Sequence, residues 1–91
     1  MKQRVSAAAI YARLGVEPHD ADFELVGCDR CGHQSLVDHE NLRVYLDPMD
    51  LRVFILNVEG ETWPPCRGCG SPDWDFVAAD RATPEWEWAV G

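Results

Sequence analysis

The sequence predicts a small, mainly β domain with antiparallel hairpins and a short N-terminal helix. Short runs in which apolar and polar residues alternate recur between clusters of turn-forming residues, a pattern typical of strands joined by tight turns. With 91 residues, the chain is near the size at which an apolar core alone gives marginal stability. Its only four cysteines form two matched pairs, which indicates a cross-link that adds to the core.

The cysteines lie in two C-x-x-C-G motifs, Cys28-Asp29-Arg30-Cys31-Gly32 and Cys66-Arg67-Gly68-Cys69-Gly70. Four thiolates at this spacing predict one closed, tetrahedral metal site that leaves no coordination position for water or a substrate. A closed site of this kind is structural rather than catalytic. We therefore expect the metal ligands to be Cys28, Cys31, Cys66 and Cys69.

Two further pairs of residues are expected to support the ligands. Gly32 and Gly70 end the two motifs, where a tight turn often needs a positive φ that glycine adopts without a steric penalty. Arg30 and Arg67 lie inside the motifs, where positive charge stabilises the thiolate form of cysteine. We expect all four to act from just outside the coordination sphere.

Other uses of these cysteines are open at the level of the sequence. Disulfides belong to oxidising compartments, but residues 1–14 lack the features of a secretory leader, so we expect a cytoplasmic protein with reduced thiols. His33 or His39 could replace one cysteine as a ligand, although four well-spaced thiolates already complete a tetrahedron.

Over residues 22–78 the chain resembles a zinc ribbon, because a strand-rich insert separates its two C-x-x-C-G motifs. The resemblance implies a zinc-ribbon (rubredoxin-like) fold that holds one structural zinc ion. The ligand pattern is also similar to that of rubredoxin, which implies iron as the alternative metal, and Trp63, Asp73, Asp75 and Phe76 add to that likeness. The long and regular insert favours the zinc ribbon.

The chain divides into three predicted segments: an N-terminal helix with its linker (1–21), the zinc-ribbon domain (22–80) and a Trp-rich acidic tail (81–91). The helix should span Val5–Leu14, with Ser6 as its N-cap and Gly15 at its C-terminal end. Its apolar face is mostly alanine, so both a docked helix and a loosely ordered one are compatible with the sequence.

Strands are predicted on both sides of the first motif, at 23–28 and 34–37. A hairpin should then pair Leu42–Leu46 with Leu51–Ile55 around a four-residue turn, with Val44 opposite Val53. In this register Tyr45 faces Arg52 across the hairpin, and Arg43 faces Phe54, each as a cation–π pair. A competing interpretation is a helix over 38–46 with Asp38 as its N-cap.

A turn at 57–60 should lead into the second motif, and a closing strand is predicted over 73–78. Trp63 or Trp74 is expected to shield the metal from water. In the tail, Trp86 and Trp88 share one face at the two-residue period of a strand. They either fold back to complete a thin core or, together with Trp74, serve as candidate partner-binding residues.

The net negative charge of the chain limits the classes of partner that it is expected to bind. Sixteen acidic residues against eight basic ones give a net charge of −8, whereas nucleic-acid binding depends on basic surface. Nucleic-acid binding would require Arg30, Arg43, Arg52 and Arg67 to gather on one face, so we do not expect it. We also expect no association with a membrane.

No arrangement of residues in the sequence is typical of a catalytic site, so we expect a protein that is not an enzyme. The favoured function is a protein–protein interaction or regulatory module whose partner has a basic surface, with a nucleic-acid machine as one setting. The alternative is a rubredoxin-like iron electron carrier.

Overall fold

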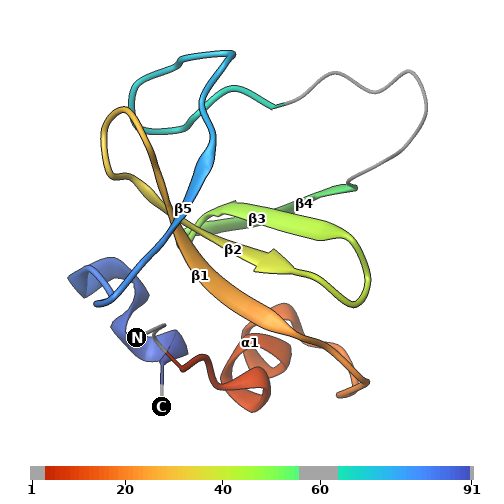
Figure 1. The fold of residues 1–91 in the computed structure, drawn as a ribbon. Coiled ribbons are helices and arrows are strands. Elements are labelled where there is room, and N and C mark those ends of the chain that lie inside the picture. Colours follow the sequence, from red (N-terminus) through yellow and green to blue (C-terminus); the bar gives the residue numbers. More distant parts are fainter. Residues whose placement is uncertain (1–3, 56–63, 91) are drawn as a thin grey trace.

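The computed structural model describes residues 4–55 and 64–90, and within them it contains one five-stranded antiparallel sheet (Figure 1). The strand order is β4-β3-β2-β1-β5. The elements are α1 (Ala7–Leu14), β1 (Phe23–Cys28), β2 (Gln34–Asp38), β3 (Arg43–Asp47), β4 (Asp50–Ile55), β5 (Phe76–Ala78) and the 3₁₀ helix η1 (Pro84–Ala89). The predicted mainly β fold with a short N-terminal helix is confirmed. No helix in the described ranges is long and apolar enough to cross a membrane.

The first four strands follow one another as hairpins, so each strand pairs with its neighbour in sequence. The predicted strands around the first motif and the hairpin after them are confirmed. The alternative helix over 38–46 is wrong, because Asp38 caps a turn instead. Its Oδ1 accepts hydrogen bonds from the N–H groups of Glu40 (3.0 Å) and Asn41 (3.1 Å).

The predicted register of the β3–β4 hairpin is wrong by one residue. Val44 lies opposite Phe54 and Tyr45 lies opposite Val53, because a bulge between Tyr45 and Asp47 shifts the pairing. A bulge places two residues of one strand against one of its partner, and alternation in the sequence does not reveal it. The predicted cation–π pairs therefore do not form in that register, and Arg52 instead pairs with Asp50 (2.9 Å).

Both faces of the three central strands β1, β2 and β3 are covered, which explains why consecutive residues of these strands are buried. Neighbouring residues of a strand point to opposite faces, and the buried side chains accordingly form two clusters. The first lies under α1 and η1: Ile10, Leu25, Leu36, Tyr45, Ala79, Trp86 and Ala89. The second lies on the cysteine side: Val26, Cys28, Val37, Val44, Leu46, Cys66 and Trp74. The metal-binding segment thus packs on the face opposite the terminal helices.

The N-terminal helix is docked and has the predicted caps. Ser6 Oγ accepts a hydrogen bond from the N–H of Ala9 (3.3 Å), and Gly15 ends the helix with a φ of 71°. The Ser6 N–H donates to Ala89 O (2.7 Å), and Val5 forms a bridge with Val90. The two terminal segments therefore lie together on one side of the sheet (Figure 1).

The strand-period interpretation of the tail is wrong, because residues 84–89 form a 3₁₀ helix. Of the two alternatives for the tail, folding back onto the core is the one that the structure shows. Trp86 is 1% exposed, and its Nε1–H donates to Gln34 O (2.9 Å). Trp88 is half-buried, stacks on Trp86 (5.7 Å between ring centroids) and lies under the guanidinium of Arg13 at 4.2 Å.

Because Trp86 joins the tail to the sheet, we expect Trp86→Ala to lower the free energy of unfolding by about 3–5 kcal/mol through the cavity it leaves. Urea denaturation of the metal-loaded protein measures this change. Glu87→Ala, on the exposed side of the same 3₁₀ helix, is the control and should change stability by at most ~0.5 kcal/mol. Equal stability of the Trp86→Ala variant and the parent would show that the tail does not contribute to the core.

Candidate metal site

The first C-x-x-C-G motif forms a tight turn, knuckle 1, between β1 and β2. Cys28 is the last residue of β1; its N–H donates to His33 O (2.9 Å), and its carbonyl accepts from the N–H of Gly32 (2.9 Å). Gly32 has a φ of 81°, as the turn was predicted to require. Inside the turn, the Arg30 N–H donates to Cys28 Sγ (3.3 Å).

The second motif, knuckle 2, repeats this hydrogen-bond pattern. The Cys66 N–H donates to Ser71 O (3.1 Å), and the Gly70 N–H donates to Cys66 O (2.8 Å). Gly70 has a φ of 73°, and the Gly68 N–H donates to Cys66 Sγ (3.3 Å). The sequence repeat is therefore a repeat of backbone geometry, and each knuckle directs its two sulfurs to the same place.

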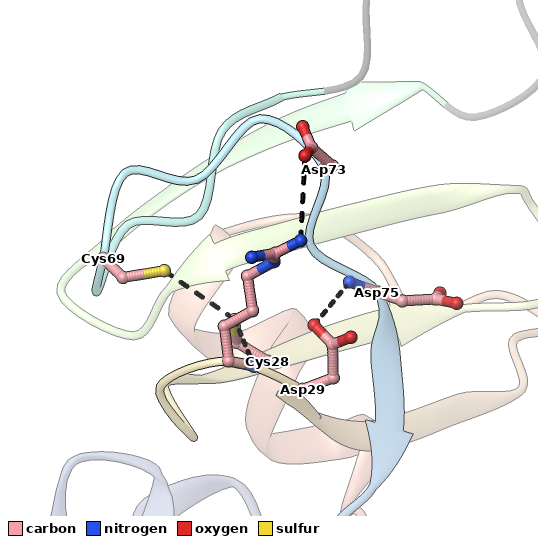
Figure 2. Close-up of polar contacts among 6 residues, drawn as sticks. Cys28, Asp29, Cys69, Asp73 and Asp75 are labelled. Carbon is pink, nitrogen blue, oxygen red and sulfur yellow. Dashed lines mark hydrogen bonds and ion pairs between the residues drawn. The ribbon is translucent and has the colours of Figure 1, made fainter.

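All four sulfurs converge between the knuckles, where the Sγ atoms lie within 4.8 Å of one another. The separation is 4.0 Å between Cys28 and Cys69 and 3.5 Å between Cys31 and Cys66 (Figure 2 shows the first pair). In a tetrahedron with metal–sulfur bonds of about 2.3 Å, each sulfur–sulfur edge is about 3.8 Å. A disulfide would need about 2.05 Å, and the cysteines are free. The predicted four-sulfur cluster is confirmed, and its spacing fits one metal ion.

Each knuckle contributes one buried and one exposed ligand. Cys28 and Cys66 are each 3% exposed and pack in the same cluster as Trp74, whereas Cys31 and Cys69 are exposed. The Trp74 ring lies edge-on to Phe76 (4.8 Å), and its Nε1–H donates to Pro64 O (2.8 Å). Trp74 thus covers the inner side of the site as expected, while Trp63 lies outside the described residues.

The cysteine thiols change one another's pKa values. Burial raises the pKa of Cys28, but hydrogen bonds from the N–H groups of Arg30 and Cys31 and from neighbouring thiols lower it to about 7. The N–H of His33 lowers the pKa of Cys31, yet partial desolvation of its sulfur and the other cysteines raise it to about 12. One sulfur therefore ionises near neutral pH and opposes ionisation of the next. A cation between the sulfurs would favour the thiolate form of these cysteines.

The knuckles are also tied to each other outside the sulfur cluster. The Asp75 N–H donates to Asp29 Oδ1 at 2.9 Å, as Figure 2 shows. The Asp29 N–H donates to Asp75 O (3.0 Å). β5, which follows knuckle 2, pairs with β1, which precedes knuckle 1. The chain segments on both sides of the site are therefore held in place by backbone pairing.

The two arginines of the motifs have different surroundings, and their predicted effect on the thiolates stays a prediction. Arg30 supports Cys28 through its backbone N–H, while its guanidinium forms an ion pair with Asp73 Oδ2 (3.7 Å). Arg67 is exposed on knuckle 2. Neither histidine considered as a ligand belongs to the sulfur cluster: His33 Nε2 lies 2.8 Å from Leu46 O, and His39 Nε2 lies 2.7 Å from a carboxylate oxygen of Glu24.

Sequence reasoning missed the part played by Gly68. A Cβ atom at this position would lie 2.5 Å from His33 Cβ and 2.8 Å from Cys31 Sγ. Real Cβ atoms do not approach so closely, so only glycine lets knuckle 2 reach knuckle 1. The neighbours come from the other knuckle, and no local sequence signal identifies them.

Comparison with known proteins identifies no family for this chain. No protein-family model matches the chain, and neither a curated protein nor a solved structure is significantly similar to it. The metal site therefore rests on the donor set and on the distances between the sulfurs.

We expect Gly68→Ala to weaken metal binding by about 10- to 100-fold, the range seen when groups that position ligands are altered. Competition with a chromophoric chelator measures the affinity. Gly27→Ala is the matched control, since the nearest atom to its new Cβ lies 3.8 Å away, an ordinary contact. Equal affinities of the two variants would contradict the close approach of the knuckles.

Proposed function

We propose that this chain is a structural-zinc protein of the zinc-ribbon type and acts as a protein–protein interaction or regulatory module. The observation that carries the proposal is the cluster of four cysteine sulfurs within 4.8 Å of one another. Four thiolates complete a tetrahedron, so the ion has no position for a substrate and stabilises the fold instead. A role in binding then falls to the surface of the protein.

Zinc is favoured over iron by the insert between the motifs. This insert contains β2, β3 and β4, all of them in the regular sheet, whereas the resemblance to rubredoxin implies an irregular loop. The N–H···S bonds of the knuckles suit either metal, because both are held as tetrahedral tetrathiolates. Metal analysis therefore separates the two functions directly.

The surface favours a basic partner. The net charge of −8, with −4 from four thiolates and +2 from zinc, becomes about −10 in the loaded protein. Arg30 and Arg52 are paired with acids, which reduces the local positive charge. The exposed acids of the described residues include Glu17, Asp20, Asp22, Asp29, Glu40, Asp73, Asp75, Asp80, Glu85 and Glu87. Such a surface repels phosphates and attracts Lys and Arg side chains.

Burial changes which residues are proposed to bind the partner. Trp74 is 4% and Trp86 is 1% exposed, so both rings serve the core and we omit them from the proposed surface. Trp88 is half-buried beneath Arg13. The acidic surface rather than the tryptophans is therefore proposed as the partner-binding element.

The purified protein should be colourless and contain one zinc ion per chain. Removing the ion with a chelator should lower the thermal midpoint by at least ~10 °C, because structural zinc contributes folding free energy. Adding zinc back should restore it. A red protein with one iron atom would support the electron carrier instead, and an unchanged midpoint after proven metal removal would refute a structural role for the ion.

The zinc-loaded protein, immobilised and exposed to an extract of its source cells, should retain a basic protein at low salt and release it at high salt. The double variant Cys31→Ser/Cys69→Ser, which loses two ligands but no acidic side chain, is the control for binding to charge alone. The retained protein is then purified and titrated by calorimetry. Equal retention by both proteins, or a gel shift of DNA or RNA at low salt, would contradict the proposed module.

A further inference from the structure

A pocket of about 250 Å³ opens beside knuckle 1, on a part of the surface that the metal site does not use. Three segments meet there: the start of β2, the β3–β4 turn and the start of η1. Its lining residues are His33, Gln34, Asp47, Pro48, Met49, Thr83, Glu85 and Trp86. Pockets for cofactors and drug-sized ligands usually enclose about 300–1,000 Å³, so this one is suited to a smaller group such as a single side chain.

Most polar groups of the lining are already engaged within the protein. Gln34 Oε1 accepts from the Thr83 N–H (2.8 Å), and its Nε2 donates to Arg81 O (2.6 Å). The indole N–H of Trp86 is bonded to Gln34 O, and His33 Nε2–H donates to Leu46 O (2.8 Å). These bonds hold the walls in place and leave the two carboxylates as the principal groups for a ligand.

The carboxylates belong to Asp47 and Glu85, and no Lys or Arg lines the pocket. Asp47 Oδ1 accepts the N–H of Met49 (2.9 Å), which fixes the side chain at the turn. Hydrogen bonds from its own N–H and from Thr83 lower the pKa of Glu85, so it is ionised at neutral pH. The pocket therefore carries negative charge that no Lys or Arg of its lining balances, and His33 is the one basic residue among the lining residues.

The remaining lining is apolar. The Trp86 ring and Pro48 are buried, whereas the Met49 side chain is 80% exposed. Methionine is flexible and polarisable, and it adapts to partners at binding surfaces. A ligand that combines an apolar stem with a cationic head matches both parts of this lining, and Lys and Arg are the side chains with that form.

We propose that this pocket receives one Lys or Arg side chain of the partner protein. The stem lies on Met49 and Trp86, and the cationic head meets Asp47 and Glu85. The inference rests on the proposed function and deepens it, because it names the point at which the basic partner is recognised.

Binding is tested with blocked amino acids and the zinc-loaded, ¹⁵N-labelled protein. Nα-acetyl-arginine-N-methylamide and the lysine equivalent should shift the Trp86 indole and the amides of Thr83 and Met49 in a saturable way at millimolar concentrations. The citrulline equivalent keeps the shape of arginine without its charge and should not shift them. Equal binding of the citrulline compound, or shifts spread over the surface, would overturn the inference.

Substitutions of single acidic residues test which carboxylates bind the cationic head. Glu85→Gln and Asp47→Asn, which keeps the acceptor for Met49, should each weaken binding about two- to fivefold, as expected for exposed charge pairs. Glu87→Gln removes the same charge from the same 3₁₀ helix but lies outside the lining, and should leave binding of the blocked amino acids in the pocket unchanged. An equal effect of Glu87→Gln and Glu85→Gln would show general charge attraction rather than a site.

The same variants separate this inference from the proposed function. If Glu85→Gln and Asp47→Asn retain the basic partner as strongly as the parent, the module stands and its recognition point lies elsewhere. If the blocked amino acids bind in the pocket but no partner is retained from the extract, the pocket stands and the proposed module is wrong.

Discussion

The convergence of four cysteine sulfurs between two knuckles is the constraint on which the rest of the structure depends. One knuckle joins β1 to β2, and the other precedes β5, which pairs with β1. A metal ion at the sulfurs therefore closes a long stretch of chain that includes the β3–β4 hairpin. The neighbouring cysteines raise the pKa of Cys31, and a cation at the sulfurs would favour its thiolate form.

The two faces of the sheet pack against different parts of the chain. One face packs against α1 and η1 and forms a conventional apolar core, in which the terminal segments hold each other through Ser6 and Ala89. The other face packs against the ligands and Trp74. With both faces covered, side chains that point to either side of a central strand are buried. A single covering layer would bury only those on one side. The metal segment thus takes the place of a second helical layer.

The acidic surface is the proposed partner-binding element of this protein. A metal ion held by four thiolates would have no open position for a substrate. Binding through charge is the use that we propose for this strongly acidic domain. The pocket beside knuckle 1 links the two features, since His33 lines it and also donates its N–H to Cys31 Sγ (3.5 Å). Knuckle 1 therefore helps to shape the proposed recognition point.

The sequence by itself determined which cysteines cluster, the glycines of the knuckle turns, the caps of α1 and most strands, because each depends on neighbours within a few residues. Only the tertiary structure decided the β3–β4 register, the 3₁₀ form of the tail, the need for Gly68 and the placing of Arg30. A bulge, a buried indole and a Cβ contact between knuckles all depend on partners distant in the chain. Such partners become visible only when packing brings them together.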